Sequence, residues 1–382
     1  MKIRYGTMLL AVFGLAACGG HSPVEKVEPT PLTDFSPERQ IKVLWSKDAG
    51  SGSKSYLRLV PALDGNSIYV GDSKGRVTAI NLEDGRERWS VDTDLTTTGG
   101  TAAADGIVVI ADRLGQVVAL DQNDGKERWR TVVSSQVLAP ALIEQGLVVI
   151  QSQDGRLHGL DAGNGKQRWL HTATVPALSL HGTGRPVAFR NAVLSGFANG
   201  RVVAVNANDG RLVWEQAVSN PRGRNEIERL VDVDAPVKIV NGTLVAANYQ
   251  GRVIAVSLRT GALIWARELS TYSGIDADSR NVFLTDEDGT VIAMAQGTGA
   301  TAWKQDKLRG RRLNAPTYID GMVVVGDFDG YVHWLSADDG HLMARYHIGG
   351  GAVQAPAIAS RDRIYVLSQS GELYALNAMR KN

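Results

Sequence analysis

Hydrophobic residues in this chain form short runs that end in polar turns, and the pattern repeats many times. In residues 117–129 an apolar run is followed by Asn-Asp-Gly and then by Trp129, four residues after Gly125. An unbroken apolar run predicts a strand that is covered on both faces, and Asn-Asp-Gly is typical of a tight turn into a second strand. Apolar residues 106–112 and a short segment before them complete about four antiparallel strands per unit.

The same unit recurs along the chain. Six copies end in tryptophan, at residues 77–89, 117–129, 157–169, 202–214, 253–265 and 291–303. A seventh ends in Ala344 and carries Trp334 where most other copies have alanine, which indicates a packing exchange within that unit. An eighth copy starts at residues 373–377 and stops there, while residues 41–45 supply an unattached strand that ends in tryptophan.

Each unit would leave two apolar faces exposed if it stood alone, so the units must stack, and a periodic tryptophan supplies a large contact between neighbours. Residues 41–382 divided among eight units give about 43 residues each, which is within the range of propeller blades. We therefore predict an all-β fold, an eight-bladed β-propeller of four-stranded antiparallel blades that is closed when the N-terminal strand pairs with residues 373–377. An open solenoid, the alternative, would leave long apolar edges exposed to other chains.

The first 18 residues have the composition of an export signal. Lys2 and Arg4 precede an apolar stretch that is too short for a stable transmembrane helix, and Leu-Ala-Ala-Cys ends at Cys18. This ending resembles the bacterial lipobox, which implies that residues 1–17 are a signal peptide and that Cys18 is acylated as the first residue of a lipoprotein. The alternative is an ordinary cleavage site beside an incidental cysteine. Cys18 is the only cysteine, so an intramolecular disulfide is excluded.

Residues 18–40 are expected to form a tether without a fold of its own. They hold four prolines among polar residues, and the 22 residues after Cys18 would reach up to roughly 70 Å at ~3.1 Å per residue. Gly19 stands where lipoproteins of the inner membrane often have aspartate, so the outer membrane is the expected destination. Removal of residues 1–17 changes the formal net charge from +1 to −1, and a near-neutral chain argues against nucleic acid as a principal ligand.

The period of the repeat is interrupted twice in succession. Trp129 follows Trp89 by 40 residues and Trp169 follows Trp129 by 40, whereas the next two intervals, ending at Trp265, are 45 and 51 residues. The additional residues lie between the tryptophan strand of one unit and the first strand of the next. Both long connections therefore emerge on the same rim of the ring and are adjacent around it.

These two connections are the predicted interface with a partner. The first, residues 175–184, holds Leu178 and Leu180, and the second, residues 219–236, mixes arginine with aspartate and glutamate. The plainer interpretations are that the leucines fill a gap between blades and that the charged connection is merely solvated. Residues 308–312, which include three arginines, emerge on the same rim and are a secondary candidate.

No pattern in the sequence indicates catalysis, a cofactor or a metal. Ser73 lies in a Gly-x-Ser-x-Gly match, but that motif requires a strand-to-helix turn and here it joins two predicted strands. The histidines are not spaced as a metal-binding pair on a helix and have no cysteine companions. The recurring Asp-Gly pairs are explained by the turns they form. We therefore expect a protein that is not an enzyme.

The unit Ala-x-(Asp/Asn)-x-x-(Thr/Asp)-Gly-x-x-x-Trp resembles the tryptophan-docking repeat of enzymes that use pyrroloquinoline quinone (PQQ). Two groups carry this repeat, the quinoprotein dehydrogenases and the BamB family of outer-membrane assembly lipoproteins. The lipobox at Cys18, the proline-rich tether, the single eight-blade domain and residues 228–234, Glu-Arg-Leu-Val-Asp-Val-Asp, make the chain similar to the BamB family over nearly its whole length.

The resemblance implies a subunit of the β-barrel assembly (Bam) complex, without a cofactor, that is lipid-anchored at the periplasmic face of the outer membrane. Its partner would be the periplasmic POTRA domains of BamA, and unfolded outer-membrane proteins would be weaker partners through exposed strand edges. The contact residues of the family correspond to Leu178, Leu180, His181, Asp232 and Asp234. His181 stands where the family has arginine, and a neutral imidazole would not make the same charge-assisted contact.

Two other interpretations stay open. A PQQ-dependent dehydrogenase would share the repeat, although such enzymes are longer and many use an adjacent pair of cysteines that Cys18 alone cannot supply. A generic periplasmic docking propeller outside the Bam complex would use the same rim for a different partner.

Overall fold

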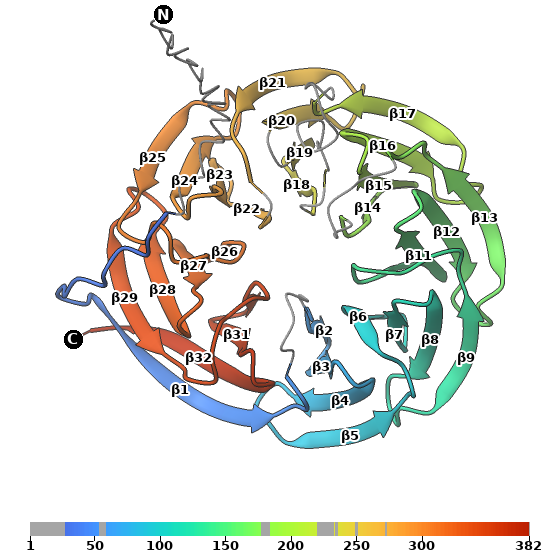
Figure 1. Ribbon diagram of the computed structural model, residues 1–382, viewed down its shortest axis with the longest axis horizontal. Coiled ribbons are helices and arrows are strands. Elements are labelled where there is room, and N and C mark those ends of the chain that lie inside the picture. The colour runs from blue at the N-terminus through green and yellow to red at the C-terminus, as the bar shows by residue number, and fades with distance from the viewer. Residues whose placement is uncertain are drawn as a thin grey trace, which may run out of the picture.

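The computed structural model describes residues 27–52, 59–176, 184–219, 233, 236–248, 251–271 and 273–381. All regular secondary structure in these residues is β-strand, and the strands form eight four-stranded sheets arranged as blades around a central axis (Figure 1). The predicted eight-bladed β-propeller is confirmed. Across this described part of the chain, no helix is long and apolar enough to span a membrane.

Blades one to four follow in chain order, each running from its innermost to its outermost strand. Blade one contains β2 (Ala62–Asp64), β3 (Ser67–Gly71), β4 (Arg76–Asn81) and β5 (Glu87–Asp92). Blade two contains β6 (Thr97–Ala104), β7 (Ile107–Asp112), β8 (Gln116–Asp121) and β9 (Glu127–Val132). Blade three contains β10 (Leu142–Glu144), β11 (Leu147–Ser152), β12 (Arg156–Asp161) and β13 (Gln167–Thr172). Blade four contains β14 (Val187–Phe189), β15 (Ala192–Phe197), β16 (Arg201–Asn206) and β17 (Leu212–Ala217).

The other four blades complete the ring. Blade five contains β18 (Lys238–Val240), β19 (Thr243–Ala247), β20 (Arg252–Ser257) and β21 (Leu263–Glu268). Blade six contains β22 (Ile275–Ala277), β23 (Asn281–Thr285), β24 (Val291–Ala295) and β25 (Thr301–Gln305). Blade seven contains β26 (Thr317–Ile319), β27 (Met322–Gly326), β28 (Tyr331–Ser336) and β29 (Leu342–His347). Blade eight contains β30 (Ile358–Ser360), β31 (Arg363–Leu367), β32 (Glu372–Arg380) and β1 (Arg39–Asp48).

Blade eight is completed by the N-terminal strand. β1 pairs antiparallel with β32 and places Trp45 opposite Ala375 and Lys47 opposite Leu373. The first and last strands of the ring therefore lie side by side (Figure 1). The predicted closure is confirmed, with β1 beginning at Arg39.

The hydrophobic core of the described residues is divided among the contacts between blades. It consists of eight clusters, and each cluster combines buried residues of two neighbouring blades. Because both faces of every sheet are covered in this way, the central strands can be apolar on consecutive positions, as β7 is from Ile107 to Ala111.

The repeated tryptophans fasten each blade to the next one. Trp129 is buried, and its indole N–H donates to the carbonyl of Ala162 in the following blade at 2.7 Å. Gly165 lies against the same ring at a φ of 70°, and a Cβ there would be 2.6 Å from Cε3 of Trp129, so glycine is required. The equivalent indole bond is made by Trp45, Trp89, Trp169, Trp265 and Trp303. The spacing of glycine and tryptophan in the repeat is therefore a consequence of contacts between blades.

Blade seven exchanges these positions. Trp334 on β28 is opposite Ala344 on β29, whereas in blade two Ala119 on β8 is opposite Trp129 on β9. Trp334 is only 1% exposed, and with Ala344 it belongs to the buried cluster between blades seven and eight, so the large ring has moved to the neighbouring strand while it still packs toward the next blade. The predicted packing exchange within this blade is confirmed.

The hairpins between the second and third strands of several blades share one turn chemistry. In the hairpin that joins β3 to β4, Oδ1 of Asp72 accepts the N–H groups of Lys74 at 2.8 Å and Arg76 at 3.0 Å. The corresponding aspartates of blades two, six and seven accept the same two bonds. Each carboxylate holds its turn by satisfying two backbone donors. Ser73 lies in the first of these turns, between two strands, which is not the strand-to-helix setting of a nucleophile elbow.

Residues 27–38, the described part of the proline-rich segment, lie against the outer side of blade seven. The N–H of Thr30 donates to the carbonyl of Arg309, and the N–H of Glu38 donates to that of Met343, each at 2.9 Å. The sequence predicts a tether without a fold of its own for residues 18–40. Residues 27–38 form no strand or helix, but they lie on the ring because they find backbone acceptors and an apolar surface on blades six and seven.

Side chains strengthen this attachment. Leu32 packs against the buried cluster between blades six and seven. The guanidinium of Arg345 lies 5.2 Å from the centre of the Phe35 ring and donates to the carbonyl of Thr33 at 3.2 Å. We call residues 27–38 the N-terminal strap.

Candidate interaction rim

Connections from the outer strand of one blade to the inner strand of the next emerge on a single rim, because every blade has the same strand order. Most of them are short, such as residues 93–96 between β5 and β6. The two longest among blades three to five are residues 173–186, from β13 to β14, and residues 218–237, from β17 to β18. They flank blade four, so the strand bounds place both long connections on one rim and next to each other, as predicted.

The residues predicted to contact a partner, Leu178, Leu180, His181, Asp232 and Asp234, lie outside the described residues, and so does the predicted acylation site Cys18. Their roles stay predictions. The structure does describe the residues from which both long connections leave the blades, and one residue inside the second connection.

That residue, Val233, is completely buried although it stands between Asp232 and Asp234. Its N–H donates to the carbonyl of Phe197 at 3.2 Å, and its side chain fills the space beside Gly196, where a Cβ would clash with it. Val233 thus ties the second long connection to the hairpin between β15 and β16 of blade four.

The residues of blades three and four beneath Val233 are also tightly packed. Gln151 of blade three donates to the carbonyl of Gly196 at 2.7 Å and accepts a hydrogen bond from Ser195. Phe197 is buried, and its ring centre lies 6.4 Å from that of His171 on β13. Blades three and four are therefore joined rigidly at the base of the rim, because buried polar groups that find partners specify one arrangement.

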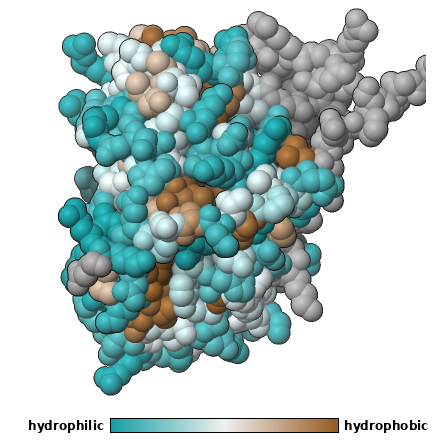
Figure 2. Space-filling model, turned by 90° about the vertical axis from the view of Figure 1, so that its left-hand side faces the viewer, coloured by the Kyte–Doolittle hydropathy of each residue, from teal (hydrophilic) through white to brown (hydrophobic). Residues whose placement is uncertain are grey.

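The secondary candidate, residues 308–312, is covered in part. Leu308 is completely buried, Arg311 is 4% exposed, and the N-terminal strap crosses beside Gly310, where a Cβ would collide with Glu28. Arg309 and Arg312 are exposed, so two of the three arginines can still meet a partner, and the role of this segment stays a prediction. Figure 2 shows the ring from this side, where hydrophilic residues cover most of the visible coloured surface and hydrophobic ones form separate small patches.

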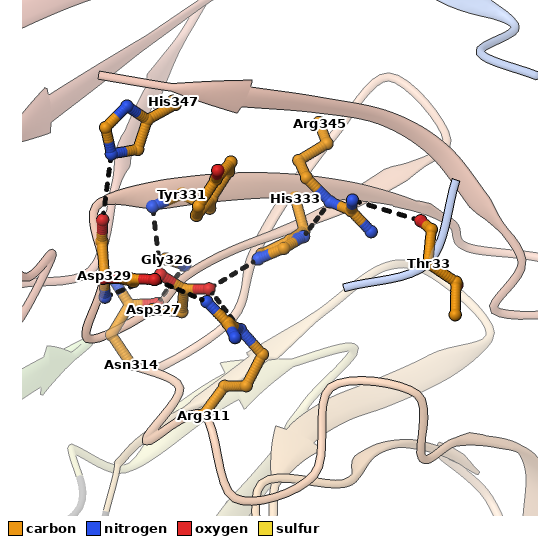
Figure 3. Close-up of polar contacts among 10 residues, drawn as sticks. All are labelled: Thr33, Arg311, Asn314, Gly326, Asp327, Asp329, Tyr331, His333, Arg345 and His347. Carbon is orange, nitrogen blue, oxygen red and sulfur yellow. Dashed lines mark hydrogen bonds and ion pairs between the residues drawn. The ribbon is translucent and has the colours of Figure 1, made fainter. Parts of the chain in front are cut away.

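Arg311 belongs to a buried polar network inside blade seven (Figure 3). Its Nε donates to Oδ2 of Asp327 at 2.7 Å, and Nε2 of His333 lies 3.0 Å from the same oxygen. Burial alone would raise the pKa of Asp327, but its bonds with His333 and Arg311 lower that pKa below the usual value. The carboxylate is therefore charged and is neutralised by Arg311.

His333 is neutral in this network. Burial lowers its pKa, and the hydrogen bond with Asp327 only partly opposes that effect. A neutral imidazole that donates from Nε2 to Asp327 can accept at Nδ1, where the Nε of Arg345 approaches to 3.4 Å. The network thus connects the interior of blade seven to Arg345, which holds the strap (Figure 3). Among the described side chains, no group of three or more His, Cys, Asp or Glu is placed to hold a metal ion.

Neither this network nor a difference among the outer strands is predicted by the sequence pattern. Trp214 on β17 is half-buried, and no described residue accepts a hydrogen bond from its indole. The sequence shows that β17 and β21 differ, since Leu-Val-Trp and Leu-Ile-Trp replace the Glu-Arg-Trp of β5 and β9, but Trp265 in β21 is docked like the others, so this signal does not predict the position of Trp214.

A family model described as outer membrane protein assembly factor BamB matches residues 38–99, 73–305 and 298–380 of this chain. The chain belongs to the BamB family. It is 48% identical to BamB of Alkalilimnicola ehrlichii over 96% of this chain and 95% of that protein. It is 35% identical to BamB of Escherichia coli over 96% of this chain and 97% of that protein.

Solved structures agree with this membership. The crystal structure of BamB from Moraxella catarrhalis is similar at a TM-score of 0.81 and 28% identity, over 88% of this chain and 100% of that one. The quinohemoprotein alcohol dehydrogenase of Comamonas testosteroni has a TM-score of 0.72 at 14% identity, over 90% of this chain and 77% of the enzyme. At that identity the dehydrogenase shows a shared propeller fold and nothing about activity.

Proposed function

We propose that this BamB-family chain is a non-catalytic docking subunit of the complex that assembles β-barrel proteins in the outer membrane. In this proposal residues 1–17 are a signal peptide, and acylated Cys18 anchors the chain at the periplasmic face of that membrane. The rim formed by the two long connections binds the POTRA domains of BamA. The ring acts as a rigid spacer that orients those domains.

The position of Val233 is the observation that carries the proposal. A charged connection held only at its two ends would lose much conformational entropy when it binds a partner. Val233 fixes the second connection at its acidic end, through a backbone bond and a buried side chain, beside a packed floor. Preorganisation of this kind favours binding, and it supports Asp232 and Asp234 as partner contacts.

The composition of the rim supports the same conclusion. Protein interfaces combine an apolar centre with a polar border. The first connection offers Leu178 and Leu180, and the second offers Asp232 and Asp234. The two connections flank blade four, which supports a single contact surface made from both.

Co-purification from outer membranes tests this function. Leu178→Glu and Asp232→Arg should each abolish the retention of BamA by tagged chain, because each introduces an unpaired charge or a like-charge contact. The matched control is Thr96→Arg, at an exposed position on the same rim between blades one and two, which should retain BamA. Retention by both interface variants, with unchanged thermal unfolding, would move the interface elsewhere.

A further inference from the structure

A cavity of about 320 Å³ lies at the junction of blades seven and eight, where the two ends of the chain close the ring (Figure 1). It opens beside the β26–β27 and β30–β31 hairpins. These hairpins leave their blades at the end opposite to the connections between blades, so the cavity lies on the other rim from the two long connections. Its volume equals that of about ten waters at ~30 Å³ each and is within the range of small-molecule sites.

The cavity exists because two parts of the repeat are missing at this junction. At the junction before it, Trp303 of blade six lies on Gly340 in the β28–β29 turn and donates to the carbonyl of Ala337. Blade seven has Ala344 in place of that tryptophan. In the described chain blade eight has no such turn, because β32 runs on to Arg380 and its neighbour β1 comes from the other end of the chain. The junction therefore lacks both the indole and the surface on which an indole docks.

The inner wall of the cavity is apolar. Trp334 of β28 and Met322 of β27 line it from blade seven, and Ile364 of β31 and Leu376 of β32 line it from blade eight. All four side chains are buried in the cluster between these two blades. An indole beside aliphatic side chains gains free energy when it covers another apolar group, so this wall favours an aliphatic or aromatic side chain of a ligand.

Two arginines stand at the mouth of the cavity. Arg39 is half-buried and Arg380 is exposed, and they lie directly opposite each other on β1 and β32. Cross-strand neighbours have Cβ atoms ~4.5–5.5 Å apart, and like charges at such positions repel each other. Among the described residues, neither guanidinium has a hydrogen bond or an ion pair with a carboxylate. The mouth therefore favours an anionic group, and a carboxylate matches the guanidinium geometry.

An unpaired acid lines the same mouth. Asp320 lies in the β26–β27 hairpin and is exposed. At the same hairpin position in blade two, Asp105 reaches the next blade and accepts from the N–H of Gly146 at 2.9 Å. Asp320 has no such bond to a described residue, so its carboxylate is available to an ammonium group. Asp362, the other acid of the cavity, already accepts from the side-chain amide of Asn377 at 2.7 Å.

We propose that this cavity binds a small zwitterion with an apolar side chain, either a dipeptide or a free amino acid. The carboxylate of the ligand lies between Arg39 and Arg380, its ammonium group lies beside Asp320, and its side chain covers the wall at Trp334. An anion without an ammonium group would leave Asp320 unpaired. The bound ligand bridges blades seven and eight at the point where the ring closes.

The probe is the dipeptide Leu-Phe, with free leucine as a smaller zwitterion. N-acetylated and C-amidated forms of the dipeptide are the controls, because each lacks one of the two charges. The protein is the full chain with Cys18→Ser, which removes the predicted acylation site. Calorimetric titration should show saturable binding at one site, at least about tenfold weaker for either blocked form. Tighter binding of leucine than of Leu-Phe would identify a free amino acid as the ligand, and the reverse order would identify a dipeptide.

Arg380→Gln should weaken the binding of Leu-Phe at least about tenfold. Its matched control is Lys42→Gln, which removes the same charge from β1 outside the cavity and should leave binding unchanged. The unfolding temperature separates a binding role of Arg380 from a structural one. Without ligand, Arg380→Gln should unfold at the same temperature as wild type or a higher one, because it removes the repulsion between opposite arginines. Leu-Phe should raise the unfolding temperature of wild type.

The absence of saturable binding by folded wild type, or equal affinity for the free and the blocked dipeptides, would overturn the proposal. So would a lower unfolding temperature of the Arg380→Gln variant, since the arginines would then serve ring closure. Ala378→Phe fills the cavity without a change of charge and should abolish binding in a chain that still unfolds cooperatively. Binding that persists in this variant would place the ligand elsewhere.

Co-purification with BamA separates this inference from the proposed function. Arg380→Gln should retain BamA, because the cavity lies on the rim opposite to the two long connections. Loss of BamA by this variant would assign the cavity to the BamA interface and overturn the inference. If wild-type chain retains no BamA but binds Leu-Phe through Arg380, the proposed function fails and the zwitterion site stands.

Discussion

Blade seven and blades four and five lie in different parts of the ring and treat their outer strands in opposite ways. The chain covers β29 with its own strap and ties that cover to a buried ion pair inside the blade. On β17 and β21 the corresponding positions are apolar and bare in the described structure. The outer strand of a propeller blade has unpaired backbone groups. The comparison indicates that charged side chains, another segment of the chain or a partner must protect these groups.

The largest expected effect concerns the covered side. Asp327→Ala should lower the free energy of unfolding by about 4 kcal/mol, because Arg311 would be left buried without its counter-charge. Asp112→Ala is the control, since Asp112 holds the same hairpin turn in blade two without a buried arginine, and it should cost only about 1–2 kcal/mol. Urea unfolding measures both. Equal losses would mean that the ion pair adds nothing to the turn.

The two kinds of tryptophan should also differ in what they contribute to stability. Trp265→Ala removes a buried ring and its bond to the carbonyl of Gln296, and should cost about 4 kcal/mol. Trp214→Ala should cost about 2 kcal/mol less, because Trp214 is partly exposed and makes no such bond to a described residue. The difference between the two unfolding free energies is the test, and its absence would show that Trp214 is docked like the others in solution.

The smallest effect is a pH dependence of strap attachment. The pKa of His341 is raised, mainly by its hydrogen bond with Asp339 and further by Glu38 of the strap. Since the folded pKa lies above the unfolded value of ~6.5, the contact stabilises fully below that value and its contribution is lost as pH rises through the folded pKa. His341 is 44% exposed, so screening limits the contribution to a few tenths of a kcal/mol.

Hydrogen exchange near Glu38 measures this effect. Protection of the Glu38 amide relative to its intrinsic rate should be greater at about pH 6 than at about pH 8, and His341→Gln should remove the difference. A pH dependence that persists in the His341→Gln variant would assign it to another group.

The elements that sequence analysis predicted are those whose signal is local and periodic. Residues equivalent to Trp129 and Gly165 recur at fixed spacing, because each blade contacts the next in the same way. The number of blades could therefore be counted from the sequence, and the closure by the Trp45 strand could be inferred from the incomplete last unit. The exchange of Trp334 and Ala344 was visible as two departures from that spacing within one unit.

What the sequence did not reveal depends on contacts between distant residues. Arg311 stands in a basic connection that resembles a solvated loop, and its partner Asp327 was explained by its turn. The strap has no periodicity, because its backbone bonds require no particular side chain and its side-chain contacts, such as that of Phe35 with Arg345, each occur once. For Leu178 and Asp232 the sequence named candidates from the family resemblance, and their roles await the co-purification described above.

If Cys18 carries the lipid, the strap limits how far the ring can lie from the membrane. Only the eight residues 19–26 lie between Cys18 and the first described strap residue, and at ~3.1 Å per residue they span at most about 25 Å, against roughly 70 Å for an unattached segment. Blade seven would then hang close beneath the bilayer, and blades three and four, which lie across the ring from it (Figure 1), would project farthest into the periplasm. The attachment of residues 27–38 to blades six and seven would thus orient the propeller, with its longest connections directed away from the membrane.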